Sequence, residues 1–476
     1  MPRLRLRSPL RWLLVVPTLL WAVAAPAAPA AHAASAAHAA SASTRAVPKE
    51  IAVKTLGNGL MVIVWPDHDI PSVALYDWFR VGSRNEQPGL TGLSHFFEHM
   101  MFNGSKDTKP GEFDRIMSEH GGSNNAFTTN DVTCYQDWFP RSALETIFRM
   151  EGDRLCCLAI DSTVVESERG VVSSERRVSV DDDNRGFLDE QVQSMSFLAH
   201  PYNIPVIGWP SDIERWKLRD LKEYFRVHYA PNNATLVVVG DVTPAEIFAL
   251  AEKYIGPIPA QPAPPEVTTI EPPQAGERRL TVRRPGQVPL IQVAYHVGPA
   301  HGADFEAEDL LRTILTTGES SRLYRRMVDQ DRVALDVSSY YARGFDPGLL
   351  HIQVTVSPEK GAAAAESALF DELSRVARDG VSAAELAKAK NVRLAAYWRS
   401  LKTIDGKASE LGEFQTFQRD WRRLFSAPDR YGRVTRAEIQ AIAKRTFAER
   451  NRNIGVLIPE DPRTAKAADA PKGGAR

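Results

Sequence analysis

Three features are scarce in this sequence of 476 residues: cysteine, surplus basic charge and long apolar runs. The formal net charge of −1 argues against a nucleic acid partner. The apolar run at residues 12–25 is short for a bilayer span. Apolar residues make up 43% of the chain and charged residues 25%, so disorder of the whole chain is excluded and large hydrophobic cores can form.

The three cysteines, Cys134, Cys156 and Cys157, allow at most one intramolecular disulfide. An oxidising compartment would permit Cys134 to pair with either of the other two, but we expect buried free thiols instead. None of the three has the spacing of a metal ligand, so the sequence gives them no chemical role.

Residues 1–44 have the composition of a secretory signal peptide. Four arginines precede the apolar run at 12–25, and an Ala/Pro/Ser/His tract follows it with several small-residue sites for cleavage. No acidic residue lies before Glu50, so removal of the four arginines takes the formal charge from −1 to −5. We therefore predict a periplasmic or secreted protein. The alternative is an uncleaved membrane anchor, which is the only membrane contact that the sequence allows.

The pattern of residues 48–255 predicts one α+β domain. Alternating apolar residues at 51–65 surround a Gly-Asn-Gly turn, and a second apolar run follows at 73–81, which is typical of β-strands. Helical patterns follow at 89–104, 141–157, 164–180 and 221–228. A strand at 234–239 and a helix at 244–254 close the domain.

Seven prolines at residues 256–278 indicate an extended linker, beyond which the same order of elements returns. Residues 279–460 predict strands at 279–282 and 291–297, a helix at 305–316, and a final helix and strand at 437–447 and 453–458. We predict a disordered tail at 461–476. The repeated order favours a duplication, although two α+β domains can also share it by chance.

The segment from His95 to His99 carries the chemistry. Two imidazoles four residues apart lie on one face of a helix, about one turn from each other, and can hold a single metal ion. Glu98 lies near that face and can take the proton of a water whose pKa the ion has lowered. This is the inverted form of the better-known zinc helix motif, and it requires a third protein ligand from elsewhere, for which residues 166–175 supply candidates.

The second half lacks this site. Alignment of Val81-Gly82 with Val297-Gly298 is an offset of 216 residues, which places Leu311, Ile314 and Leu315 where His95, Glu98 and His99 stand in the first half.

These motifs resemble the pitrilysin-type inverzincins, the metallopeptidase family of the mitochondrial processing peptidase and of bacterial two-subunit zinc proteases. The resemblance covers about residues 48–460 and includes Gly92-Leu93-Ser94, Phe102-Asn103-Gly104-Ser105 and residues 121–128. In that family a third ligand glutamate follows the second histidine by some 76 residues, which is Glu175 here. The resemblance implies two homologous α+β domains, each a mostly antiparallel sheet flanked by helices, that form half of a clamshell.

The resemblance also implies roles for five further residues. Glu168, seven residues before Glu175, would orient the metal ligands; the alternative is a solvated helical glutamate. The segment Asn125, Ala126, Phe127 and Thr128 would be an edge strand whose backbone binds a peptide substrate as an added strand.

The sequence departs from the family in its second half. Many relatives carry an Arg and, seven residues later, a Tyr that hold the substrate carbonyl, and an alignment on Ser320-Ser321-Arg322-Leu323 places Val328 and Leu335 there. Apolar side chains donate no hydrogen bond to a carbonyl. We therefore expect a heterodimer with a homologous subunit that bears the Arg/Tyr pair. The alternative is an active monomer or homodimer that uses Arg322, Tyr324 or Arg325.

We thus predict an exported endopeptidase with one zinc ion per chain, held by His95, His99 and Glu175, in which Glu98 activates a water. Manganese or cobalt would suit the same ligands. The alternative function is a non-catalytic binding or assembly subunit that has kept the peptidase fold.

Overall fold

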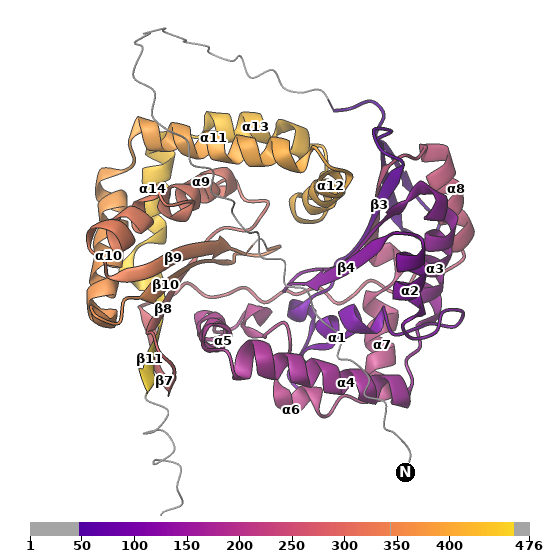
Figure 1. Ribbon diagram of the computed structural model, residues 1–476, viewed down its shortest axis with the longest axis horizontal. Helices are drawn as coiled ribbons and strands as arrows, with labels where there is room; N and C mark the ends of the chain where they lie inside the picture. Colours follow the sequence, from indigo (N-terminus) through magenta and orange to yellow (C-terminus); the bar gives the residue numbers. More distant parts are fainter. Residues whose placement is uncertain (1–46, 343, 461–476) are drawn as a thin grey trace, which may run out of the picture. The chain divides into compact units, whose positions relative to one another are not determined.

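The computed structural model describes residues 47–342 and 344–460 (Figure 1). The predicted signal segment and C-terminal tail lie outside the described residues. Within the described residues, no helix combines the length and the apolar character needed to cross a bilayer.

A six-stranded sheet forms in the first half of the chain, with strand order β1-β2-β6-β3-β5-β4. All neighbours are antiparallel except β2 and β6. The strands are β1 (Ala52–Thr55), β2 (Met61–Pro66), β3 (Ser72–Phe79), β4 (Ser123–Thr128), β5 (Thr133–Pro140) and β6 (Ala234–Gly240). The predicted substrate strand β4 therefore lies at a sheet edge, as expected.

The helices of the first half include both segments that carry predicted metal ligands. They are α1 (Leu93–Met100), α2 (Glu112–Glu119), α3 (Leu144–Cys157), α4 (Ser162–Arg176), α5 (Asn184–Ser196), α6 (Pro210–Ile213), α7 (Leu218–His228) and α8 (Pro244–Tyr254). Short helical turns are η1 (Ser83–Asn85), η2 (Arg141–Ala143), η3 (Arg177–Asp181), η4 (Pro201–Asn203) and η5 (Pro231–Asn233). The helix expected at 164–180 thus continues beyond α4 as the π-helix η3.

A five-stranded sheet forms in the second half, with strand order β7-β11-β8-β10-β9. Its strands are β7 (Arg278–Pro285), β8 (Leu290–His296), β9 (Ala334–Tyr341), β10 (Leu349–Val356) and β11 (Arg452–Glu460). Its helices are α9 (Phe305–Thr316), α10 (Gly361–Asp379), α11 (Ala383–Ser400), α12 (Ile404–Gln418), α13 (Arg423–Arg433) and α14 (Arg436–Thr446), with the turns η6 (Tyr324–Gln330) and η7 (Glu449–Asn451).

The second sheet repeats the first without β1. The strands β7 and β11 are parallel, as β2 and β6 are, and the remaining pairs are antiparallel in both sheets. The prediction of an α+β fold with two similar sheets flanked by helices is confirmed.

Each sheet has one face covered by helices of its own half. In the first half, apolar side chains of α1, α3, α7 and α8 form a core with the sheet. In the second half, α9, α10 and α14 do the same.

The opposite face of each sheet is covered by a helix from the other half (Figure 1). Helix α12 packs on β3 and β6, and α5 packs on β8 and β11. Glycines permit both contacts: a Cβ on Gly412 of α12 would lie 2.0 Å from Trp78 Nε1, and one on Gly455 of β11 would lie 2.4 Å from Val192 of α5. The linker therefore separates the two sheets along the sequence, but the helices that cover each sheet come from both halves of the chain.

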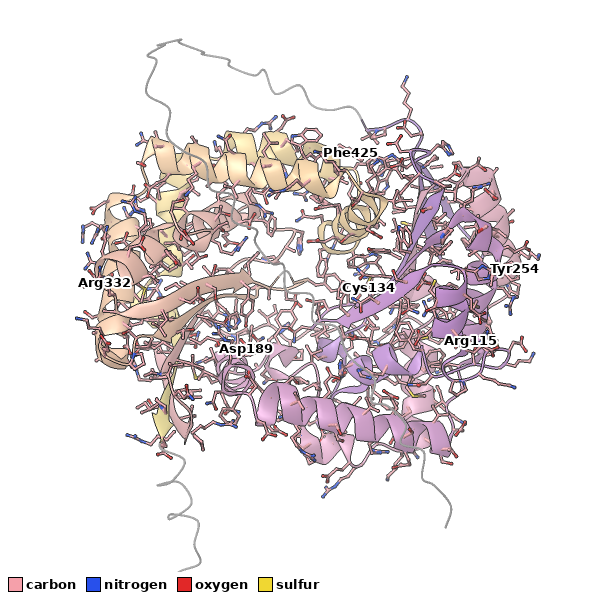
Figure 2. All side chains as sticks on the ribbon, viewed as in Figure 1. Arg115, Cys134, Asp189, Tyr254, Arg332 and Phe425 are labelled. Carbon is pink, nitrogen blue, oxygen red and sulfur yellow. A yellow bond between two sulfur atoms is a disulfide. The ribbon has the colours of Figure 1, made fainter. Side chains whose placement is uncertain are left out.

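The cysteine prediction is wrong for two of the three residues. Cys156 and Cys157 form a disulfide, whereas Cys134 is a buried free thiol on β5 (Figure 2). Cys134 faces the side of the sheet that α12 covers, while the body of α3 packs on the other side. Alternation along the strand thus keeps Cys134 away from the other two cysteines.

Candidate metal centre

Buried polar contacts hold the start of α1. The carboxyl group of Glu86 accepts hydrogen bonds from the backbone N–H groups of Gly92 at 2.6 Å and Ser94 at 2.7 Å. These are donors that the first turn of a helix leaves without intrahelical partners. Burial raises the pKa of Glu86 to about 8.

Aromatic residues fix how α1 is rotated. Phe96 and Phe97 lie in the first core, and the backbone carbonyl of Phe97 accepts a hydrogen bond from the Tyr135 hydroxyl at 2.9 Å. The hydroxyls of Tyr224 and Tyr229 contact Ser94 at 2.7 and 3.1 Å. The opposite face, with the two histidines, therefore points away from the core.

Helix α4 presents Glu168 and Glu175 two turns apart. Its N-terminus is capped by Asp161, whose side chain accepts hydrogen bonds from two backbone N–H groups. Its last residue, Arg176, is buried and donates to Glu190 of α5 at 2.7 Å and to the carbonyl of Gly208 at 2.8 Å. These bonds anchor the helix end where Glu175 lies.

The structure brings His95, His99 and Glu175 together. His95 Nε2 lies 3.5 Å from one carboxylate oxygen of Glu175, and His99 Nε2 lies 3.2 Å from the other. All three ligand atoms lie within 4.8 Å of one another.

This geometry fits a zinc ion. With bonds of about 2.0–2.1 Å, two ligand atoms of a tetrahedral site lie about 3.3 Å apart. The two nitrogen–oxygen separations, 3.5 Å to one oxygen of Glu175 and 3.2 Å to the other, lie on either side of that value. Two imidazole nitrogens and a carboxylate oxygen are also a donor set that zinc accepts.

Glu168 orients the His99 ring through Nδ1, the ring nitrogen that does not face Glu175. One of its oxygens lies 2.8 Å from His99 Nδ1, and the other accepts a hydrogen bond from Asn103 Nδ2 at 2.6 Å. Burial lowers the pKa of His99, but hydrogen bonds to Glu168 and Glu175 outweigh this effect and raise it to about 9. The Glu168 residue is only 8% exposed, so it is not a solvated helical glutamate.

Glu98 lies in a cavity of about 520 Å³ together with His95 and Glu175. Helix α5 contributes Asp189, Glu190 and Gln193 to its wall. The second half contributes Tyr340 and Ala342, and the Tyr340 hydroxyl donates a hydrogen bond to Asp189.

The predicted substrate strand runs into this cavity. Phe127 and Thr128 line the cavity, whereas Asn125 and Ala126 lie farther back on the same strand. Along β4, only β5 is paired among the described residues. The free edge of β4 therefore offers backbone groups to an added strand.

Val328 and Leu335, which stand where many relatives carry the Arg/Tyr pair, lie outside the cavity lining. Val328 is on η6, beside the second core, and Leu335 is 54% exposed on β9. Arg322, a proposed substitute, is held by Glu385 at 2.6 Å and Glu372 at 3.3 Å.

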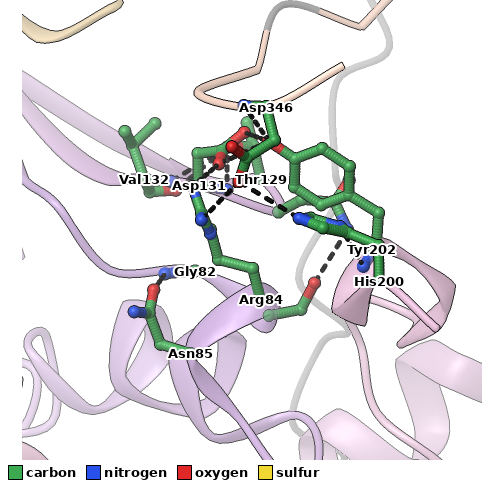
Figure 3. Close-up of polar contacts among 11 residues, drawn as sticks. Gly82, Arg84, Asn85, Thr129, Asp131, Val132, His200, Tyr202 and Asp346 are labelled. Carbon is green, nitrogen blue, oxygen red and sulfur yellow. Dashed lines mark hydrogen bonds and ion pairs between the residues drawn. The ribbon is translucent and has the colours of Figure 1, made fainter. Parts of the chain in front are cut away.

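A buried polar network joins η1 and the end of β4 to the second half (Figure 3). Arg84 contacts Asp131 at 3.0 Å and Asp346 at 2.5 Å. The Tyr202 hydroxyl donates to Asp131 at 2.7 Å, and His200 contacts Asp346 at 3.1 Å.

Sequence reasoning missed several of these residues. Asn103 belongs to the motif Phe102-Asn103-Gly104-Ser105, but the motif alone predicts no role for it. Glu86 is an acid upstream of a helix start, which is a recognisable signal. Tyr340 and Gln193 carry no local signal because only packing between distant segments brings them to the cavity.

Comparison with known proteins identifies the family. The family model described as "Insulinase (Peptidase family M16)" matches residues 62–208, and that described as "Peptidase M16 inactive domain" matches residues 215–393. Zinc protease PqqE of Helicobacter pylori is 30% identical over 372 residues, which are 77% of this chain and 84% of that protein. The chain belongs to peptidase family M16. The predicted family resemblance is confirmed.

One further relative matches in sequence, and two solved structures match in fold. The uncharacterized zinc protease YmxG of Bacillus subtilis is 24% identical over 83% of this chain and 95% of its own. The crystal structure of a protease from Helicobacter pylori matches with a TM-score of 0.83 and 28% identity, over 86% of this chain and 99% of that one. The first half of the periplasmic protease PqqL from Escherichia coli matches with a TM-score of 0.70 and 20% identity, over 90% and 98% of the two chains.

Proposed function

We propose that this chain is the catalytic subunit of an exported zinc metalloendopeptidase that hydrolyses peptides or unfolded polypeptide segments. The proposal is carried by the convergence of His95, His99 and Glu175 at zinc-ligand separations, with Glu98 in the same cavity. These three residues would hold one zinc ion per chain.

Bound zinc would supply Lewis acidity toward the substrate carbonyl and toward a water molecule. Glu98 accepts the proton of the attacking water and then donates it to the leaving amine. Glu168 keeps the His99 ring oriented. The substrate lies extended along β4 and bonds to the backbone of residues 125–128.

A second homologous chain supplies the Arg/Tyr pair in this proposal. Of the candidate donors of this chain, Arg322 is bound by two glutamates, and Tyr340, which lines the cavity, donates to Asp189. This chain matches 98% of the first half of Escherichia coli PqqL but 49% of the whole PqqL chain. That match supports a protein that contributes one half of a clamshell.

We further propose that the mature protein is periplasmic or secreted. The signal-like composition of residues 1–44 carries this part of the proposal. A relative, PqqL of Escherichia coli, is described as a periplasmic protease.

A second candidate is a binding or assembly subunit without catalysis. It is favoured by the apolar residues Val328 and Leu335 at the positions of the Arg/Tyr pair and by the "inactive domain" model that matches residues 215–393. The presence of all three candidate zinc ligands and of Glu98 argues against this second candidate.

The deciding experiment is hydrolysis of a quenched-fluorescent peptide library by the purified mature chain. The chain is assayed alone and with an Arg/Tyr-bearing homologue, each with and without a chelator. We expect chelator-sensitive cleavage in the mixture only. Cleavage by the chain alone would overturn the heterodimer, and no cleavage by a zinc-loaded mixture would favour the binding subunit.

A Glu98→Gln variant tests the base directly. General acid–base catalysis contributes about 10²–10⁴-fold, so we expect a loss of that order in kcat with zinc content unchanged. Glu359→Gln is the matched control because Glu359 is an exposed glutamate outside the cavity. Equal activity of both variants would show that Glu98 is not the base.

A further inference from the structure

A second cavity, of about 310 Å³, adjoins the cavity that holds the candidate metal ligands. The two cavities share four lining residues: Phe127, Asn130, Gln193 and Ala342. Phe127 belongs to β4, and Asn130 lies two residues beyond the end of that strand. The second cavity therefore lies where a peptide added to β4 would continue past the metal ligands.

Six of the sixteen residues that line this second cavity are aromatic. Its rings come from both halves of the chain and are Trp78, Phe127, Phe197, Tyr202, Tyr341 and Phe417. The small residues Ala342, Gly344 and Gly348 leave the space between these rings open. Such a wall favours a flat apolar group, since aromatic pairs add about 0.5–1.5 kcal/mol beyond the burial of their area.

The volume sets the size of the occupant. A cavity of roughly 150 Å³ lined by apolar side chains accommodates benzene. The 310 Å³ observed here is about twice that, which admits one phenyl, phenol or indole side chain but not a folded segment.

The one buried carboxylate in the wall is already satisfied. Asp131 accepts hydrogen bonds from Arg84 at 3.0 Å and from Tyr202 at 2.7 Å (Figure 3). Asp131 therefore does not select a cationic side chain, and the second carboxylate of the lining, Glu413, is partly exposed. The hydroxyl of Ser409 can bond the hydroxyl or indole N–H of a tyrosine or tryptophan, whereas Gln193 already contacts the Tyr202 carbonyl and His351.

We propose that this second cavity is a specificity subsite that binds one aromatic side chain of the peptide substrate and thereby sets where the peptide is cut. This inference rests on the proposed peptidase function and on peptide addition to β4. A single anchored side chain at a set distance from Glu98 fixes the register of the added strand, which β-pairing alone leaves free to slip by two residues.

The first test follows the cut site. Peptides of small polar residues carry one phenylalanine that is moved stepwise, and mass spectrometry of the digests by the zinc-loaded holoenzyme locates the cleavage. We expect the cut to move with the phenylalanine at constant spacing. The variant Ser409→Phe, which fills the second cavity from α12, should lose this dependence, and Ser409→Ala should keep it. A cut that ignores the phenylalanine in the wild type would overturn the proposal.

The second test needs no turnover. Binding of labelled peptides with Phe or Ala at the anchoring position is measured on the full chain with Glu98→Gln. We expect on the order of 10-fold tighter binding of the Phe peptide, and a ratio near 1 once Ser409→Phe is added. Equal affinity for both peptides overturns the subsite. A clear Phe preference without any cleavage by the zinc-loaded wild type, either alone or mixed with the Arg/Tyr-bearing homologue, retains the subsite and rejects the peptidase. If Ser409→Phe fails to fold, Phe127→Ala, which removes one wall, should also lower the ratio.

Discussion

The helices α1 and α9 follow corresponding strands, β3 and β8, in two sheets of the same strand order, yet they differ in what they carry. Helix α1 presents His95, Glu98 and His99 toward a cavity and toward α4. At the matching positions α9 has Leu311, Ile314 and Leu315, all buried in the second core.

The surroundings differ as much as the ligands do. Buried polar groups such as Glu86, Tyr224 and Glu168 support α1, and each bonds an atom of that helix. The face of α9 that matches the ligand face of α1 packs against apolar side chains instead. At these positions the first half thus has less apolar packing and orients polar side chains instead. The second half fills the matching positions with apolar side chains that stabilise the fold.

Substitution of one residue in each helix tests the difference between them most directly. We expect His99→Ala to abolish stoichiometric zinc binding and activity, because two ligands remain of three. Leu315→Ala should keep the zinc but lower the free energy of unfolding by about 2–5 kcal/mol, since it opens a cavity in the core. Zinc analysis and denaturant unfolding in chelator measure both. Full zinc content in His99→Ala would contradict the site.

A smaller effect is expected when the support of α1 is weakened and its ligands are kept. Glu168→Gln should lower the affinity for zinc by about 10–100-fold, because the amide orients the His99 ring less strongly than the carboxylate does. Glu166→Gln is the matched control, since that glutamate lies on the same helix and its side chain is 67% exposed. Competition with a chromophoric chelator measures the zinc affinities. Equal affinities of the two variants would show that Glu168 does not orient His99 for zinc binding.

The start of α1 should show a pH-dependent stability. Burial raises the pKa of Glu86 to about 8 from a usual 4.5, so the folded chain binds a proton there that the unfolded chain has released. This contribution is complete below about pH 4.5 and is lost as the pH rises through about 8. Wild type should therefore lose stability relative to Glu86→Gln as the pH rises from 5 to about 8.5. Unfolding in denaturant at several pH values measures it, and an opposite slope would show that α1 is held by an ionised Glu86.

The smallest effect is expected at the junction between the halves. Asp346→Asn alters the part of the network that is half-exposed, so the loss of unfolding free energy should stay below about 1 kcal/mol. Thermal unfolding of the two proteins at equal salt checks this value. A larger loss would mean that the second half holds η1, and with it α1, more strongly than the contacts indicate.

Local sequence pattern predicts the helices α1 and α9 and the ligand face of α1. The spacing of His95 and His99 places both imidazoles on one helix face, because the helical repeat is set by the backbone. The strand alternation at 51–65 and the helices at 244–254 and 305–316 follow from the same local rules, and the structure contains all of them. The positions of Glu168 and Glu175 came from family resemblance and not from local physics.

Other features depended on contacts between segments far apart in the chain. The exchange of α5 and α12 between the sheets, the arrival of Tyr340 at the cavity and the aromatic second cavity all arise from packing across more than a hundred residues. The cysteine pairing depended on which face of the first sheet Cys134 occupies. Local sequence determined the helices, the strands and the ligand face of α1, because backbone periodicity is a short-range property. Only the tertiary structure decided what surrounds that face, because close packing couples residues that no local pattern relates.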